Sequence, residues 1–383
     1  ALGAVLFLLN LGATIFADPH ELVAAPMRKA VQALLARNAD ALALFRRAVA
    51  LEECKFEFDF THGLEVKTEC FVAVVRAGRL FALEGIEQIE CGKEDEAAES
   101  VRASLRCGLA LYRQPTLFQH LGGTFCCEVA LAALARLASR GNPSPAALLR
   151  LEETLRATAD QKWLERVLLG ERAWGVSFFP HLLTGAGRQM AVQTLQMIED
   201  WGYQVGTWRL RPPPEVLYAL PGAYFKAVEV YSLDFWTELL AASRRPHPGF
   251  FLARQRIERQ FDESVPRHYF LFHAGRSTIR LALDGRVRAM ARLESARTAL
   301  AILRYKARQG GPPDRLETLV PDFMDAVPTD PYSGKPVLYR KTDTGFTVYA
   351  IGENAKDDGG QVRVVGEPLI FPDVGFQVTW PGE

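Results

Sequence analysis

Apolar residues recur at helical spacing along most of the first 309 positions. Between residues 21 and 51 they repeat every three or four residues, which predicts two amphipathic helices with a break near Asn38. The same periodicity predicts further helices over 71–83, 94–111, 123–139, 146–157, 161–175, 188–201, 214–243, 250–261 and 267–309. Long helices joined by short connections indicate a mainly α fold.

Start and stop signals separate several of these helices. Ser144 and Pro145 have the residue types of an N-cap and a first helical position, and Gly141 is a typical stop. We expect a second break near Pro221–Gly222 and a loop at Gly122–Gly123. The pattern of helical hairpins resembles tetratricopeptide-type repeats without their strict period. It favours a solenoid-like array or an irregular bundle.

Two stretches of alternating residues, 54–60 and 64–70, interrupt the helical pattern and predict a β-hairpin inserted near 54–70. A three-residue loop at 61–63 places Cys54 opposite Cys70, and this register predicts a cross-strand disulfide. The alternative is two unrelated buried thiols. A disulfide would indicate an oxidising compartment.

The composition changes after Gln309. A Gly-Pro segment ends the last long helix, and a short helix is expected over 315–320. Alternating residues then predict strands over 337–341, 346–351 and 375–380. The chain therefore ends in a small α+β module.

This module resembles the globular domain of the major pseudopilin of type II secretion systems. The resemblance is carried by the run from Ala296 onward, with VPTDP at 327–331 and GKP at 334–336. The whole chain also resembles uncharacterised, membrane-anchored bacterial proteins of planctomycete-like type. A pseudopilin carries its assembly helix directly before the module, whereas here a long helical region intervenes. We therefore do not expect a pilus subunit.

The pseudopilin resemblance implies a calcium site in the acidic loop after the second strand. Asn354, Asp357 and Asp358 occupy the corresponding places, and oxygen ligands from a short loop suit a hard cation. Asn354 stands where a charged ligand is expected, which weakens binding. The alternative is a solvated turn. Asp330, before Pro331, is interpreted as a turn cap rather than a ligand.

Residues 1–17 contain no charged side chain. We interpret residues 1–19 as a membrane anchor or the remnant of a signal segment, and a buried core helix is the alternative. The expected organisation is then an α-helical domain at 20–275, and a long helix plus the pseudopilin-like module at 276–383. This arrangement places the protein in the cell envelope, on the periplasmic side of the inner membrane.

Charge and motif content exclude several classes of function. With 45 basic and 45 acidic residues the formal charge is zero, so the strongly basic signature of a nucleic-acid binder is missing. The sequence contains no HExxH, no GxSxG and no phosphate-binding loop motif. An arginine-rich run at 276–292 is interpreted as an ion-paired surface.

We therefore expect a non-enzymatic scaffold or accessory subunit of a membrane or envelope complex, with other protein subunits as partners and calcium as the one expected cofactor. A hydrolase-type enzyme with an unrecognised site is one alternative. A self-assembling filament or envelope protein is the other.

Overall fold

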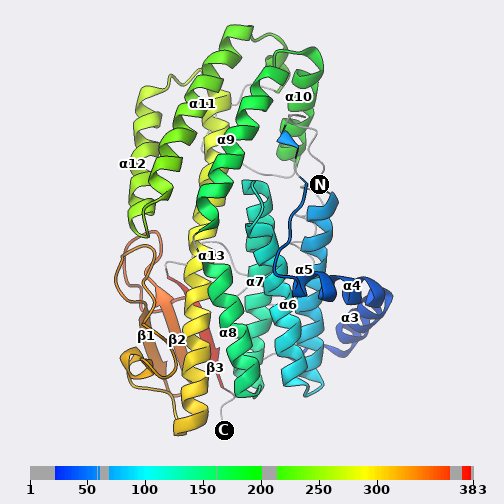
Figure 1. The fold of residues 1–383 in the computed structure, drawn as a ribbon, viewed down its shortest axis with the longest axis vertical. Coiled ribbons are helices and arrows are strands. Elements are labelled where there is room, and N and C mark those ends of the chain that lie inside the picture. Colours follow the sequence, from blue (N-terminus) through cyan, green and yellow to red (C-terminus); the bar gives the residue numbers. More distant parts are fainter. Residues whose placement is uncertain are drawn as a thin grey trace.

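The computed structural model describes residues 22–57, 59–60, 69–160, 162–200, 214–362 and 373–380. This part of the chain is mainly helical, with eleven α-helices and one small antiparallel sheet (Figure 1). The α-helices are α3 (Ala25–Arg37), α4 (Ala39–Ala50), α5 (Glu69–Glu90), α6 (Glu94–Tyr112), α7 (Leu117–Arg140), α8 (Pro145–Ala159), α9 (Trp163–His181), α10 (Gly185–Asp200), α11 (Gly222–Ser243), α12 (Gly249–Ser264) and α13 (Phe270–Gln309). The short elements are η2 (Pro214–Tyr218), η3 (Leu316–Leu319), β1 (Leu338–Thr342), β2 (Gly345–Ala350) and β3 (Val374–Thr379).

Helix α13 is the longest element, with 40 residues, or about 60 Å at 1.5 Å per residue. Its first part shares a hydrophobic core with α9, α11 and α12, to which Phe272 and Leu283 contribute. Its last part shares another core with α5–α8 and the sheet, to which Leu293 and Leu300 contribute. The helices therefore form two groups, α5–α8 and α9–α12, that stack end to end along α13 (Figure 1).

The predicted breaks between helices are found in the structure, whereas α5, α7 and α9 each extend about six residues beyond a predicted end. Asn38 separates α3 from α4, and the Ser144 hydroxyl accepts a hydrogen bond from the Ala147 backbone N–H at 3.3 Å, with Pro145 as the first residue of α8. Gly141 ends α7 with a φ of −98°, so its conformation is open to any residue. A Cβ there would lie 2.9 Å from the Leu137 side chain, and glycine is needed for space.

The expected loop at Gly122–Gly123 is instead part of α7. A Cβ on Gly122 would lie 2.2 Å from the Phe71 ring, and one on Gly123 would lie 2.9 Å from the Tyr112 ring. These glycines let α5, α6 and α7 approach closely.

Helix α7 is long and apolar enough to span a membrane. Among the described residues it is the only such helix, and 72% of its most apolar window is buried in the protein. Its apolar composition therefore reflects the core.

The β-hairpin expected near 54–70 is not found where it can be checked. Cys70 lies in the first turn of α5, because the helical spacing of Phe71, Val74 and Val75 extends backwards to include it. The described residues from Cys54 to Glu57 form no strand, and residues 58 and 61–68 lie outside the described part. The strand predicted to end at Cys70 is therefore wrong.

The terminal module has the strands that the alternating pattern predicts. The sheet has the order β1-β2-β3 with antiparallel pairing, and Phe346 of β2 lies opposite Lys341 of β1 and Val378 of β3. All six residues of the central strand β2 are buried. Phe346 and Val378 belong to the same core as Leu134 of α7 and Leu151 of α8. The expected boundary between residues 275 and 276 lies within α13, and this core joins the module to the helices.

The two helical groups also meet where α9 passes the start of α7. Gly170 of α9 lies so close to Pro115 that a Cβ would come within 1.9 Å of the Pro115 carbonyl oxygen. The next residue, Glu171, accepts a hydrogen bond from the backbone N–H of Leu117 at 2.6 Å. This bond satisfies one of the free N–H groups at the start of α7. Burial raises the pKa of Glu171 to about 7.

We expect the Gly170→Ala substitution to lower the free energy of unfolding by about 3 kcal/mol, because the added methyl group must displace backbone. Gly275→Ala is the matched control. Gly275 lies inside α13 with open space around it, so alanine there should raise stability by about 0.5–1 kcal/mol. Denaturant unfolding followed by circular dichroism measures both. Equal effects of the two substitutions would contradict a close contact at Gly170.

Candidate functional site

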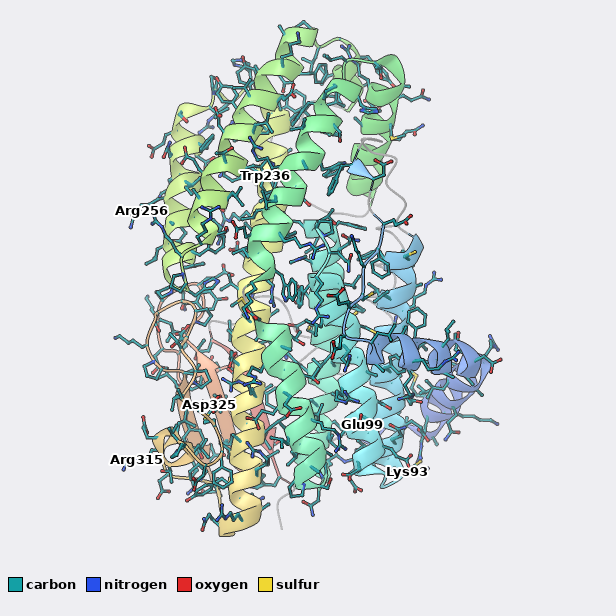
Figure 2. All side chains as sticks on the ribbon, in the orientation of Figure 1. Lys93, Glu99, Trp236, Arg256, Arg315 and Asp325 are labelled. Atoms are coloured by element: carbon teal, nitrogen blue, oxygen red, sulfur yellow. The ribbon has the colours of Figure 1, made fainter. Side chains whose placement is uncertain are left out.

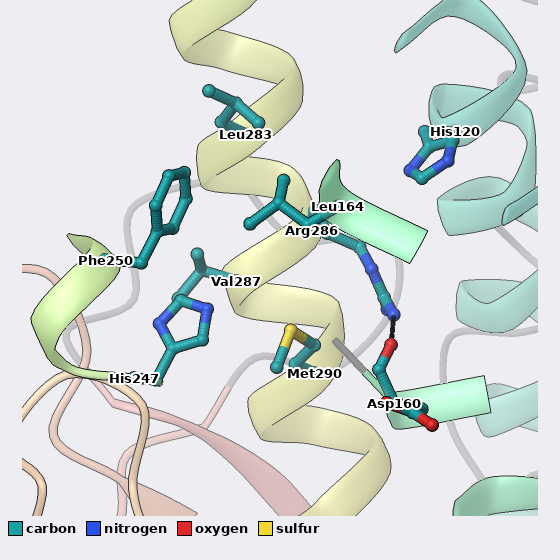
Figure 3. A pocket seen from close by; sticks show the side chains of 9 residues that line it. All are labelled: His120, Asp160, Leu164, His247, Phe250, Leu283, Arg286, Val287 and Met290. Carbon is teal, nitrogen blue, oxygen red and sulfur yellow. Dashed lines mark hydrogen bonds between the residues drawn. The ribbon is translucent and has the colours of Figure 1, made fainter. Parts of the chain in front are cut away.

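A small cavity lies at the junction of the two helical groups and the terminal module (Figure 3). Arg286, Val287 and Met290 of α13 line it, together with His120 of α7 and His247 of the loop before α12. Figure 3 shows Arg286 extending from α13 towards the end of α8. The cavity therefore gathers polar groups from segments that are far apart in the sequence.

Arg286 holds the end of α8. It is 7% exposed, and its Nη2 donates to the backbone carbonyls of Thr158 and Asp160, both at 3.0 Å. Its guanidinium lies over the Tyr112 ring, 3.9 Å from the ring centre. The negative end of the α8 dipole and the face of the ring both favour this buried cation. Its Nη1 has no hydrogen-bond partner among the described residues.

Two buried imidazoles face the same region. Burial, and then the positive charge of Arg286, lower the pKa of His120 to about 3 and that of His247 to about 4. The backbone of Gln114 and Tyr112 partly opposes the lowering of the His120 pKa, and the backbone of Pro331 does the same for His247. Nε2 of His120 and Nδ1 of His247 remain without partners in the described part of the chain. Both rings are neutral at neutral pH.

The size of the cavity decides what it can hold. Its volume is about 10 Å³, which is the room that one water molecule needs. An imidazole with a pKa of 3–4 is also a weak base at neutral pH. The arrangement favours a polar joint between α7, α8, α13 and the terminal module over a reaction centre.

A larger groove opens beside this cavity. It has a volume of about 290 Å³ and lies between α13 and the turn at Pro328–Pro331, with His247 and Met290 common to both spaces. Glu294 and Arg297 on its wall form an ion pair with an N–O distance of 2.8 Å. The groove is large enough for a small ligand.

A second groove shares Arg297 and lies between α8, α13 and the segment 321–325 that follows η3, with a volume of about 250 Å³. Arg304 crosses it and pairs with Glu152 at 2.7 Å. Burial raises the pKa of Glu152, and Arg304 opposes this effect. Each groove thus contains an arginine that is paired with a carboxylate.

The arginine-rich run of α13 is ion-paired, as predicted, but mostly with other elements. Arg276 pairs with Asp262 of α12, Arg288 with Glu353 at 2.8 Å, and Arg292 with Glu128 of α7. Arg286 is the exception, since no carboxylate pairs with it among the described residues. Arg286 and Arg292 are buried, so some arginines of the run connect α13 to its neighbours inside the protein and others lie on the surface.

The expected calcium loop is closed by its own hydrogen bonds. The Asn354 amide donates to Asp358 at 2.7 Å, and Asp357 accepts from the Tyr349 hydroxyl at 3.1 Å and from a backbone N–H. Asp373 of the neighbouring bridge accepts from the backbone N–H groups of residues 358 and 360, and burial together with the nearby Asp358 and Asp357 raises its pKa. Within the described ranges no three acidic, His or Cys side chains are arranged as a metal site.

Asp330 has the role that the sequence predicts. Its carboxylate accepts from the backbone N–H of Tyr332 at 2.8 Å, the Ser333 hydroxyl at 2.7 Å and the backbone N–H of Ile351 at 3.2 Å. It caps the turn and ties it to the end of β2.

The predicted Cys54–Cys70 disulfide is absent, and both cysteines are free in this structure. Cys70 lies in α5 and not in a strand, so it has no cross-strand partner. The two thiols are nevertheless near each other. Burial raises the pKa of Cys54, Arg113 opposes the shift and Cys70 adds to it.

No family model, curated protein or solved structure matches this chain. The pseudopilin resemblance therefore remains a prediction. No motif spacing relates His120, His247 and Arg286, so the sequence does not mark them as a group.

We expect acid to destabilise the protein through His120. Its pKa is about 3 in the folded state and 6.5 in an ordinary environment, so the folded state binds fewer protons between these values and stability falls as the pH drops from 6.5. At pH 4.5 this one group should account for about 2–3 kcal/mol of the loss. His120→Gln should remove that part of the slope, whereas the same change at the exposed His268 should not. Urea unfolding at several pH values measures both slopes, and parallel slopes for wild type and His120→Gln would refute this prediction.

Proposed function

We propose that the protein is a non-enzymatic scaffold or accessory subunit of a membrane or envelope complex. In this proposal the N-terminal segment attaches the chain to the periplasmic face of the inner membrane, and the helical surface binds other protein subunits. One observation carries the proposal, namely an apolar stripe on the exposed face of α9.

The stripe consists of Leu169, Val176 and Leu183, which are 49%, 49% and 43% exposed. Their spacing of seven residues places the first two on one face of α9, and Leu183 continues that line just beyond the helix end at His181. The opposite face is buried against α11, with Val167 and Leu168 in the core. An aligned apolar stripe next to polar residues is typical of a surface that another protein covers.

The packing of the terminal module favours the scaffold proposal over the alternative of a self-assembling filament protein. Its strands share a core with α7, α8 and α13, and the backbone N–H of Thr379 donates to the Ser139 hydroxyl of α7 at 3.2 Å. A module that is built into the helical core in this way has less free surface for self-assembly. In this proposal the predicted resemblance to a pseudopilin concerns the module alone.

A hydrolase-type enzyme is the competing proposal, and the groove of about 290 Å³ beside His247 is the feature that favours it. Such an enzyme needs a base that is effective near neutral pH. His247, with a pKa lowered to about 4, is poorly suited to this task. The scaffold proposal is therefore the stronger of the two.

We expect Leu169→Glu combined with Val176→Glu to release partner subunits, because carboxylates on the stripe would be buried at the interface. The measurement is size-exclusion chromatography and mass spectrometry of the protein extracted from native membranes in mild detergent. Leu252→Glu with Leu281→Glu is the control, as these leucines are exposed to a similar degree on α12 and α13. Wild type and control should elute with stoichiometric subunits, and the α9 variant should elute alone with an unchanged melting temperature.

Two results would contradict the proposal. Retention of all subunits by the α9 variant would exclude this stripe as the interface. A wild-type protein that elutes as a lone monomer would overturn the scaffold proposal and favour a search for catalysis at the groove.

We also propose that the loop with Asn354, Asp357 and Asp358 binds calcium weakly. Its oxygen donors suit a hard cation, and a cation would relieve the crowding of negative charge around Asp373. Millimolar Ca²⁺ should raise the melting temperature by about 2 °C or more. Asp357→Asn with Asp358→Asn should abolish the rise, while Asp343→Asn, in the exposed β1–β2 turn, should leave it. An equal rise in all three proteins would indicate that Ca²⁺ binds elsewhere.

A further inference from the structure

Helices α3 and α4 bury very little of their surface. Each has one buried residue, Val31 in α3 and Leu42 in α4. Large apolar side chains are exposed along the same segment of 30 residues: Leu22 (67%), Met27 (42%), Leu34 (40%), Leu44 (57%) and Leu51 (65%). Figure 1 shows the pair projecting from one side of the α5–α8 group. This surface is apolar without being part of a core.

Polar contacts fix the orientation of the pair. Arg28 of α3 pairs with Glu87 of α5 at 2.9 Å, and Arg46 of α4 pairs with Glu84 at 2.6 Å. Arg106 of α6 donates to the Leu51 carbonyl at the end of α4, at 3.0 Å. Because one side of each helix is held against α5 and α6, the other side is held outwards.

The outward faces combine leucines with arginines. Leu44 and Arg47 are three residues apart on one face of α4, and Leu51 follows as the C-cap just beyond the helix end at Ala50. On α3, Met27 and Leu34 lie one turn before and one turn after the buried Val31 and flank the face that packs on α5, whereas Arg37 lies further round the helix. All of these residues are exposed. A long arginine side chain beside leucines can lie along an apolar surface while its charged end reaches outwards.

The charge of this segment differs from that of the whole chain. Residues 22–51 contain five basic residues and one acidic residue, Asp40, which gives a net charge of +4, and the exposed Glu52 and Glu53 that follow Leu51 lower it to +2 over residues 22–53. Arg28 and Arg46 are used in the ion pairs with α5. Lys29, Arg37 and Arg47 have no carboxylate partner among the described residues. The unpaired positive charge therefore lies on the same helices as the exposed leucines.

We propose that the outward faces of α3 and α4 bind the surface of an anionic lipid bilayer. The leucines enter the headgroup region, and Arg37 and Arg47 contact lipid phosphates. Amphipathic helices with leucines and basic residues bind in the plane of the interface, and each basic residue near an anionic surface adds about 1 kcal/mol. This inference rests on the proposed position of the chain at a membrane and adds the lipid class. A protein surface would need acidic groups opposite the arginines and an apolar groove for both helices.

The test uses the complete chain and two kinds of vesicle. One is made of phosphatidylcholine alone, and the other of three parts phosphatidylcholine to one part phosphatidylglycerol. An apolar N-terminal anchor would contribute equally to both, so the difference in binding reports the charge-dependent surface. We expect wild type to bind the anionic vesicles at least ~10-fold more tightly, and salt at about 0.5 M to remove the difference.

Two variants locate the effect on α3 and α4. Lys29→Gln with Arg37→Gln and Arg47→Gln removes three cations, and should lose ~10–100-fold in binding to anionic vesicles while binding to neutral ones is kept. Leu44→Glu with Leu51→Glu should also weaken anionic binding. The matched control is Arg166→Gln with Arg256→Gln and Arg315→Gln, which removes three exposed cations elsewhere. Figure 2 shows Arg256 and Arg315 on the side of the molecule away from α3 and α4. Circular dichroism checks the fold of each variant.

The possible results separate the lipid surface from the scaffold proposal. Equal binding of wild type to both vesicles, or equal losses in the two triple-cation variants, would overturn the lipid surface and leave the α9 interface untouched. Loss of co-purifying subunits in the α3–α4 variants, with vesicle binding unchanged, would make these helices a protein interface instead. Failure of wild type to bind either vesicle would refute both the lipid surface and the membrane position on which it rests.

Discussion

The two helical groups and the sheet depend on α13 being shared by two hydrophobic cores. One core joins its first part to α9, α11 and α12, and the other joins its last part to α5–α8 and the sheet. A helix of this length has little stability alone, so it depends on the packing along both parts. The sheet and both helical groups depend on α13 in turn, because their relative positions are set by it. A break within this helix would therefore separate the two cores.

Arginines tie this helix to its neighbours. Arg292 reaches α7, Arg304 reaches α8, and Arg254 of α12 reaches Asp284 of α13. Removing one partner of a buried pair leaves a charge uncompensated, which costs more than the pair contributes. Such ties fix the register of packed helices without requiring a reaction. The lowered pKa values of His120 and His247 also need no catalytic explanation. Burial and the nearby positive charge of Arg286 are sufficient causes.

Local patterns predicted the elements of this fold well, and contacts between distant residues were beyond them. The helix breaks at Asn38 and Ser144–Pro145 and the three terminal strands follow from periodicity and capping, which act over a few residues. Gly122 and Gly123 look like a loop in sequence, yet their lack of side chains serves the packing of α7 on Phe71 and Tyr112. The alternation before Cys70 was interpreted as a strand, but the helical face that begins at Phe71 determines its structure. The cavity at Arg286 could not be predicted, because its polar groups meet only through the fold.

The proposed protein and lipid surfaces place different demands on the same framework. The stripe of α9 belongs to the α9–α12 group, whereas α3 and α4 are attached to α5 in the other group (Figure 1). A bilayer that contacts α3 and α4 therefore leaves the α9 face accessible to a protein subunit. For both contacts to hold a fixed geometry, the two groups must not rotate against each other. The shared helix α13, the contact of Gly170 with Pro115 and the bond from Glu171 to the start of α7 supply that restraint. A framework stiffened between two unlike surfaces suits a subunit that positions other proteins at a membrane.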